Sequence, residues 1–139
     1  MLATRIVDHM MENDLFSQWL GIEVQEVKEG YCRLLMTVRQ EMLNGFGIVH
    51  GGITFSLADS ALAFASNSRN KKSLVLDASM SFTAPVNNHD QLIAEAIEAN
   101  TTRSTGIYHI TVTNQNGKKV AFFKGIVFRK DEPWFAEAE

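Results

Sequence analysis

The sequence predicts an α+β domain in which an antiparallel β-sheet curls around one long buried helix. Three observations favour this fold class. Residues 52–67 are apolar on almost every side, which is typical of a buried helix. Four strand-like runs follow this helix and a hairpin precedes it, and short connections between consecutive strands favour antiparallel pairing. At 139 residues the chain can bury a core of its own, so we expect one domain over residues 1–139.

The first predicted element is a short amphipathic helix over residues 5–20, which Gly21 is placed to end. Its apolar positions recur with helical spacing: Ile6, Met10, Leu15, Trp19 and Leu20. A hairpin over residues 22–38 follows, with its turn at Glu29 and Gly30. The second strand of this hairpin puts four apolar side chains on one face: Cys32, Leu34, Met36 and Val38.

Four strands are predicted after the central helix, at residues 73–85, 91–102, 104–114 and 118–130. The first of them alternates cleanly, with one face made of Leu74, Leu76, Ala78, Met80 and Phe82. A turn that contains Asn116 and Gly117 joins the last two, and an Asn-Gly pair is the strongest short hairpin signal.

Composition excludes several classes of protein. A net charge of -3 without a block of like charges argues against binding to nucleic acid. No apolar run approaches the roughly 18 residues that span a membrane, and the first residues lack the pattern of a secretory signal. Cys32 is the single cysteine, so no intrachain disulfide can form, and we expect it in the core. We therefore expect a cytoplasmic protein with no nucleic-acid or membrane partner.

Common cofactor and metal motifs do not fit this chain. Gly45, Gly47 and Gly51 nearly match a dinucleotide fingerprint, but the last spacing is one residue too long and no βαβ unit surrounds them. No phosphate-binding loop and no Gly-x-Ser-x-Gly elbow is found. The four histidines are far apart in the sequence and show no metal-ligand spacing. We expect neither a metal nor a cofactor.

Residues 43–65, "LNGFGIVHGGITFSLADSALAFA", carry the chemistry that remains. A helix entered through His50, Gly51 and Gly52 offers free backbone N–H groups and a positive dipole end, which can hold an oxyanion. Alternatively, the glycines only make a turn and His50 caps or packs. Asp59 stands among apolar residues of the helix, where Asp is unfavourable, and a partly buried carboxylate tends to have a function. The alternative is that Asp59 simply faces water.

The same stretch, "NGFGIVHGGITFSLADSALAFASNS", closely resembles the signature of hotdog-fold thioesterases of the phenylacetic acid degradation (PaaI) type. The segments "SFTAPV", "TRSTGIYHITV" and "GKKVAFFKG" also look like that family, so the resemblance covers nearly the whole chain. It implies a hotdog fold and an acyl-coenzyme A thioesterase without a cofactor. It also implies that Asp59 is the catalytic carboxylate, that the Gly51 amide polarises the thioester carbonyl, and that Asn44 and His50 shape the site.

Spacing predicts that this site needs two copies of the chain. Gly51 and Asp59 are eight residues apart, which is about 12 Å along a helix, whereas both must come within about 3 Å of one reacting centre. A two-fold dimer with antiparallel central helices would bring Gly51 of one chain to Asp59 of the other. The family resemblance implies a site at such an interface, and further a tetramer of two dimers that meet through the exposed sheet face.

The resemblance also suggests where the substrate lies, with its acyl chain in the dimer interface and its nucleotide at the surface. Arg103 and Lys124 resemble basic positions near that nucleotide, although they fit equally as solvated surface charges. Gly52, Phe46, Phe55 and Leu62 are candidates for binding the substrate, with the apolar ones equally compatible with core packing. Phe46 ranks first, because it stands in a loop between two glycines.

Several alternatives stay open from the sequence. Asp59 could deprotonate a water, which we favour, or attack the carbonyl itself. The acyl group could be aryl, such as hydroxyphenylacetyl in phenylacetate degradation, or a medium-chain fatty acyl group, and the resemblance favours aryl. A hydratase of the same fold is disfavoured because residue 64 is Phe64 and not His. A non-catalytic acyl-CoA-binding protein is the remaining alternative.

Overall fold

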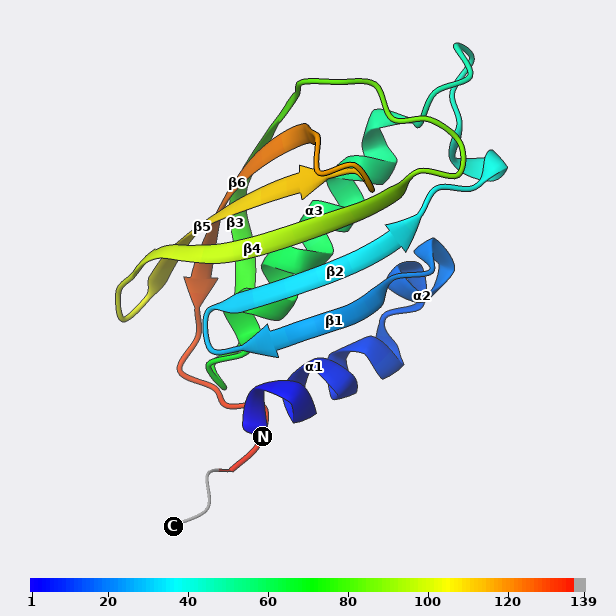
Figure 1. The fold of residues 1–139 in the computed structure, drawn as a ribbon. Coiled ribbons are helices and arrows are strands. Elements are labelled where there is room, and N and C mark those ends of the chain that lie inside the picture. Colours follow the sequence, from blue (N-terminus) through cyan, green and yellow to red (C-terminus); the bar gives the residue numbers. More distant parts are fainter. Residues whose placement is uncertain (137–139) are drawn as a thin grey trace.

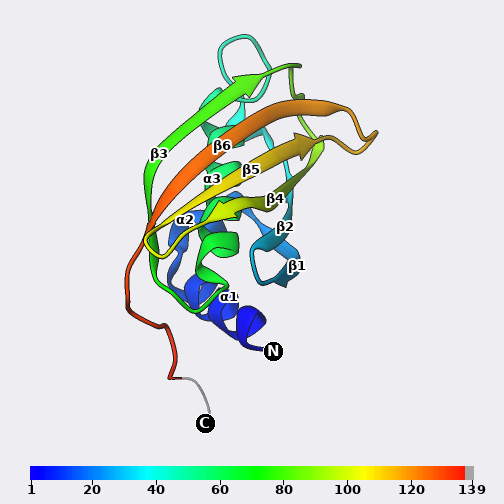
Figure 2. The ribbon, with the colours of Figure 1, turned by 90° about the vertical axis from the view of Figure 1, so that its left-hand side faces the viewer.

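Residues 1–136, which the computed structural model describes, form a six-stranded antiparallel sheet that curves around the helix α3 (Gly51–Asn67). The strands lie in the order β1-β2-β4-β5-β6-β3. Their bounds are β1 Glu23–Lys28, β2 Tyr31–Thr37, β3 Ser73–Phe82, β4 Gln91–Thr101, β5 Thr105–Thr113 and β6 Lys119–Arg129. Figure 2 shows the sheet from its side, bent over α3. The predicted α+β architecture is confirmed, and so are the two predicted hairpins.

The N-terminal helix differs from its prediction. One helix was expected over residues 5–20, but two are present, α1 (Leu2–Asn13) and α2 (Leu15–Leu20). Asp14 separates them because its backbone leaves the helical region and its side chain accepts the Ser17 N–H, which caps α2. The break changes the phase of the second helix, so Leu15 and Trp19 are 75% and 48% exposed instead of lying on the buried face.

The core lies between α3 and the concave face of the sheet. Its largest fully buried side chains include Leu34, Met36, Leu57, Phe64, Leu92 and Ile110. The face predicted for the second strand is confirmed, since all four of its apolar residues are buried. Each such side chain contributes about 1.5–3 kcal/mol through burial. This packing fixes the position of α3 and therefore of its first turn, where the candidate site lies.

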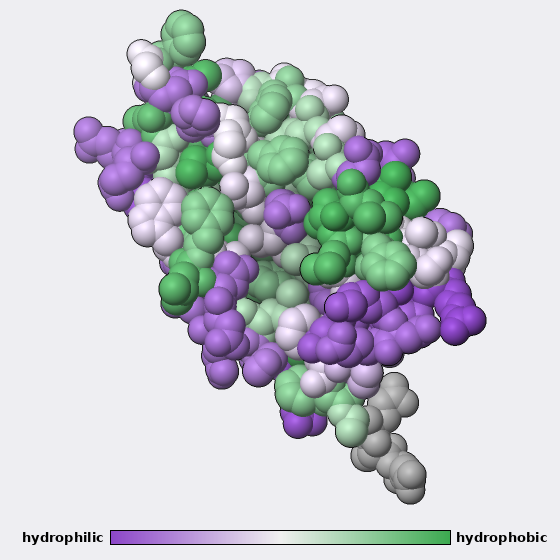
Figure 3. Space-filling view, turned by 180° about the vertical axis from the view of Figure 1, so that it is seen from behind, coloured by the Kyte–Doolittle hydropathy of each residue, from purple (hydrophilic) through white to green (hydrophobic). Residues whose placement is uncertain are grey.

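Strand β3 lies at the sheet edge beside β6, and the single apolar face predicted for it is wrong. A bulge at residues 75–77 shifts the register, so Leu74 lies beside the exposed Phe128 while Met80 lies beside the buried Phe123. The bulge therefore leaves apolar side chains in solvent: Leu74, Val75 and Leu76. The view from behind shows apolar side chains gathered in a dense green area next to a purple, hydrophilic one (Figure 3).

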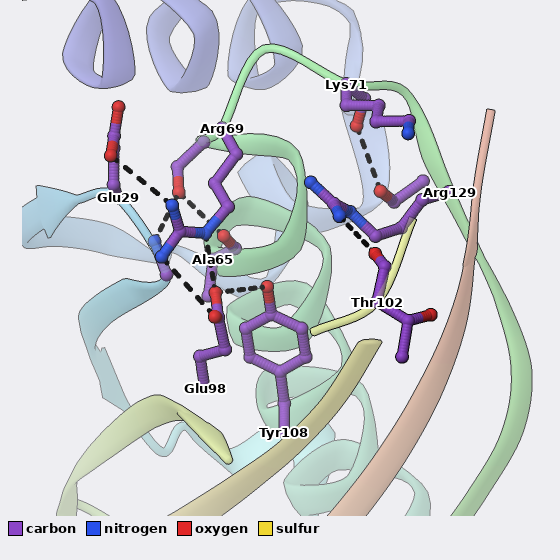
Figure 4. A network of polar contacts seen from close by, with 11 residues as sticks. Glu29, Ala65, Arg69, Lys71, Glu98, Thr102, Tyr108 and Arg129 are labelled. Atoms are coloured by element: carbon purple, nitrogen blue, oxygen red, sulfur yellow. Dashed lines mark hydrogen bonds and ion pairs between the residues drawn. The ribbon is translucent and has the colours of Figure 1, made fainter. Parts of the chain in front are cut away.

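A polar network holds the segment that follows α3 against the sheet (Figure 4). Arg69 pairs with Glu98 of β4 at 2.6 Å and with Glu29 of the β1–β2 turn at 3.4 Å. Tyr108 of β5 donates its hydroxyl to Glu98 at 3.2 Å. Burial by itself would raise the pKa of Glu98, but the hydrogen bond from Arg69 leads the effects that hold it below its usual range. Burial, followed by the charge of Glu98, raises the pKa of Tyr108 to about 12.

Candidate active site

The loop before α3 is built around Asn44. Its side-chain oxygen accepts the Phe46 N–H at 2.9 Å, and its backbone N–H donates to the Ile48 carbonyl at 2.8 Å. The end of the loop is held on both sides, because Val49 donates its N–H to Val86 and His50 donates its N–H to the Met42 carbonyl. These bonds fix the path of the loop into the helix, and the shaping role of Asn44 stays a prediction.

The first turn of α3 begins with the amide of Gly51. His50 is the N-cap residue, and its Nδ1 accepts the Gly52 N–H at 3.3 Å while its carbonyl accepts the Ile53 N–H at 2.9 Å. Within residues 1–136, the Gly51 N–H has no acceptor. His50 does act as a cap, but this cap satisfies its neighbours and leaves Gly51 free at the positive end of a 17-residue helix.

A cavity of about 470 Å³ opens beside this amide, a volume typical of small-molecule sites. Its walls are Asn44, Ile48, Val49, Gly51, Thr54, Phe82, Thr83, Ala84, Pro85, Val86 and Val120. Thr54 is only 1% exposed, and its hydroxyl has no hydrogen-bond partner within residues 1–136. A buried hydroxyl without a partner costs free energy, so the cavity wall holds two unsatisfied polar groups, this hydroxyl and the Gly51 amide.

Asp59 lies two turns further along α3 and is not part of this cavity wall. Its carboxylate is half-buried and makes no ion pair within residues 1–136. Burial, and after it the charge of Asp14, raises the pKa of Asp59 above its usual range. A raised pKa makes the ionised carboxylate a stronger base.

A second cavity, of about 370 Å³, lies on the other side of the helix start. Its walls are Phe16, Glu41, Met42, Leu43, His50, Gly52, Ile53 and Ser56. Gly52, Ser56 and Asp59 follow one another at helical spacing on the less covered side of α3, so this cavity lies on the side of the helix that carries the carboxylate.

Phe16 is a wall residue that the sequence analysis missed. Its ring stacks on Trp19 at a centroid distance of 6.0 Å, and the Arg39 guanidinium lies 4.4 Å from the Trp19 ring. The spacing of these two aromatic residues was a usable signal. The sequence pattern of residues 5–20, however, predicts one continuous helix with Trp19 on its buried face, which gives no reason to expect an exposed aromatic pair.

The other predicted substrate residues are not gathered at these cavities. Phe46 is 91% exposed in the loop, and Phe55 packs edge-to-face on Phe123 at 5.1 Å. Leu62 is fully buried against Gly125 in the core.

The predicted basic residues lie at other places on the surface. Arg103, in the β4–β5 turn, pairs with Asp131 at 3.2 Å. Lys124 is exposed on β6 beside His109 of β5. Neither belongs to the walls of the two cavities described above. Their contact with a nucleotide stays a prediction.

Within residues 1–136, no three His, Cys, Asp or Glu side chains cluster closely enough to hold a metal ion. In the same part of the chain, no helix combines the length and apolar character needed to span a membrane.

Comparison with known proteins gives consistent matches over most of the chain. A model of the thioesterase superfamily matches residues 46–121. The acyl-coenzyme A thioesterase PaaI of Escherichia coli is 40% identical over 116 residues, which cover 84% of this chain and 83% of that protein. The structure of the E. coli PaaI protein from the phenylacetic acid degradation operon has a TM-score of 0.92 at 37% identity, covering 94% of this chain and 95% of that one. A variant of the phenylacetic acid degradation protein PaaI of Thermus thermophilus has a TM-score of 0.81 at 37% identity, covering 84% and 99%.

Proposed function

The chain belongs to the thioesterase superfamily, which makes it a thioester hydrolase, and we propose that its substrates are acyl-coenzyme A thioesters. The reaction releases a free acid and coenzyme A. The observation that carries this proposal is the unused Gly51 amide at the start of α3 together with a half-buried carboxylate, Asp59, on the same helix. The name of the E. coli relative, acyl-coenzyme A thioesterase, supports the same substrate class.

The chemistry follows from these two groups. The Gly51 N–H donates to the thioester carbonyl oxygen, and it stabilises the negative charge that develops there as the carbonyl is attacked. Asp59 removes a proton from the attacking water, and its raised pKa suits this role as general base. The leaving thiolate needs little help from an acid, since its thiol has a pKa of about 8.5. Asn44 and His50 set the direction of the Gly51 amide through their hydrogen bonds.

The site is composed of two subunits in this proposal. Along one α3 the amide and the carboxylate are about 12 Å apart, and Asp59 is outside the cavity that Gly51 lines. An antiparallel contact between two α3 helices, along the side that carries Gly52, Ser56 and Asp59, brings each carboxylate to the partner's Gly51. The unpaired edge of β3, with its exposed apolar side chains, extends the same contact.

For the acyl group we propose an aryl preference, with hydroxyphenylacetyl as the model substrate and medium-chain fatty acyl groups as the alternative. The second cavity supports it, because the Phe16 ring forms part of a wall next to the side of α3 that carries Asp59. An aromatic acyl group can stack on such a ring.

At the level of assembly we propose a tetramer of two dimers. Exposed apolar residues on the sheet support this contact: Ile97, Phe122 and Phe128.

A panel of acyl-coenzyme A thioesters, assayed for release of free thiol, tests the reaction and the acyl preference together. We expect hydrolysis of phenylacetyl and hydroxyphenylacetyl thioesters.

The Asp59→Asn variant should lower kcat about 10³-fold with unchanged fold. A wild-type chain that binds these ligands without releasing thiol would refute the hydrolase proposal. Oxygen from labelled water found in Asp59 after a single turnover would replace the general-base route with nucleophilic attack.

A mixing experiment tests the composite site. Gly51→Pro deletes the amide hydrogen at the first helical position, where proline is favoured, and the His50 backbone (φ -65, ψ 132) tolerates a following proline. Gly51→Ala, which keeps the N–H, is the matched control. Asp59→Asn and Gly51→Pro chains should each be inactive alone. Coexpressed, they should recover about a quarter of wild-type activity, because half of the random dimers contain one intact site out of two. No recovery would mean that the site lies within one chain.

A further inference from the structure

A hydrogen-bonded chain joins α2 to α3 directly beside Asp59. Asp14, the N-cap of α2, accepts the Ser17 hydroxyl at 2.6 Å as well as the Ser17 N–H at 3.0 Å. The Ser17 hydroxyl also lies 2.8 Å from the hydroxyl of Ser60, the residue next to Asp59, and both serines are buried. Buried hydroxyls held at this distance fix the first residues of α2 against one turn of α3, and this turn carries the carboxylate.

Among the ionisable groups around Asp59, Asp14 is the one whose charge acts on the pKa of Asp59. Asp59 is the single ionisable residue of α3 itself. From the inner face of the sheet, Cys32 and Tyr108 are the buried titratable side chains, and both have pKa values raised to about 12, so they are neutral near pH 7. His50 caps the helix start two turns away. Among residues 1–136, Asp14 is therefore the neighbouring group whose negative charge acts on the carboxylate.

We propose that Asp14 is a positioning residue for the thioesterase reaction: through Ser17 and Ser60 it holds its own negative charge beside Asp59 and so strengthens Asp59 as a base. Two carboxylates that approach each other in a partly buried place cannot both ionise freely, so the second proton leaves at a higher pH. The Ser17 contacts satisfy Asp14 in its ionised form, because a carboxylate accepts both the N–H and the hydroxyl. The charge of Asp14 thus adds to the effect of burial and increases the affinity of Asp59 for a proton. This inference rests on the proposed function, in which Asp59 accepts a proton from water.

The test is the pH profile of kcat/KM for phenylacetyl-coenzyme A in Asp14→Asn. Asn is also a favoured N-cap, so this variant keeps the start of α2 and removes only the charge. The acidic limb of the profile should move to lower pH, because the variant lacks the like charge that, after burial, raises the pKa of Asp59. One pH unit below the wild-type limb, the variant should keep a larger fraction of its own plateau activity than wild type keeps. On the plateau it should be slower, since its base is weaker.

Two control variants separate charge from structure. Asp8→Asn removes an exposed carboxylate of α1 and should leave the limb at its wild-type position. Ser17→Ala keeps the charge of Asp14 but removes the hydroxyl bridge, so its limb should stay closer to wild type than that of Asp14→Asn. An unchanged limb in Asp14→Asn, or an unchanged limb in Ser17→Ala, overturns the inference while the wild-type enzyme still hydrolyses thioesters. A wild-type chain without hydrolysis would instead remove the proposed function itself.

Discussion

Replacing Thr54 with valine tests whether the cavity beside Gly51 is built for a polar ligand. The Thr54 hydroxyl is buried and has no partner in the part of the chain that the structure describes, and such a group costs about 1–3 kcal/mol. Valine exchanges the hydroxyl for a methyl group of similar size and has a similar helix propensity. We therefore expect the free energy of unfolding to rise by about 1 kcal/mol, the lower end of this range, because the methyl group must also fit the cavity wall.

The same change should weaken substrate binding. If the substrate supplies the hydrogen-bond partner of the Thr54 hydroxyl, removing the hydroxyl should raise KM about fivefold, which corresponds to about 1 kcal/mol of binding free energy. The value of kcat should stay nearly unchanged. Stability is measured by urea unfolding at one fixed protein concentration, because oligomer assembly contributes to it. Thr83→Val is the matched control, since Thr83 lines the same cavity but donates its hydroxyl to the Lys119 carbonyl at 3.0 Å.

The two threonine variants should change stability in opposite directions. Thr83→Val loses a satisfied but exposed hydrogen bond, so its free energy of unfolding should fall by about 0.5 kcal/mol. A Thr54→Val protein that is less stable than wild type and has an unchanged KM would refute the reasoning. It would mean that the hydroxyl has a partner in the free protein and none in the complex.

Two further predictions concern the core and the polar network. A Cβ at Gly125 would overlap one methyl group of Leu62 and lie 3.0 Å from the other, so Gly125→Ala should lower the free energy of unfolding by about 1–3 kcal/mol in urea titrations. Gly45→Ala, which has open space around the added Cβ, should not lower the free energy of unfolding in this way. Equal stability of the Gly125→Ala and Gly45→Ala variants would contradict the close packing of Leu62. The lowered pKa of Glu98 means that its contacts stabilise the fold above its ordinary pKa and that this stabilisation is lost as the pH falls through the folded value. Glu98→Gln should therefore be about 1 kcal/mol less stable than wild type at pH 7. Between about pH 6 and pH 3 it should lose less of its free energy of unfolding than wild type does. An equal loss in both proteins would mean that Glu98 is not the source of the acid-dependent loss of stability.

The central helix and the two hairpins could be predicted because their signals are local. An apolar segment such as residues 52–67 has no solvent-facing side, so it must be enclosed whatever surrounds it. The Asn116-Gly117 turn is similarly decided by its own backbone, since Gly117 adopts a φ of 75, which glycine adopts more readily than other residues. The break at Asp14 was missed because an N-cap and a helix-interior aspartate look alike until the Ser17 N–H is seen to donate to it.

The place of β3 could not be predicted for a different reason. Pairing between strands depends on backbone groups that every residue has, so the sequence does not state that β3 joins β6 at the far edge and not β4, its successor in the chain. The bulge at residues 75–77 then decided which of its side chains face solvent. An apolar–polar alternation in the sequence predicts only that a strand has two different faces, and it does not predict which side chains face solvent.

The sequence by itself determined the residue types of the site and their spacing: a His-Gly-Gly helix start, and Asp59 two turns further on. Eight residues along a helix span about 12 Å, and this distance is the reason why a composite site could be predicted from the sequence. Only the tertiary structure decided which polar groups are left unsatisfied, because a donor is free or paired according to what the rest of the chain brings to it. Among residues 1–136 it left the Gly51 amide and the Thr54 hydroxyl without partners, and it placed Asp14, the N-cap of another helix, next to the carboxylate.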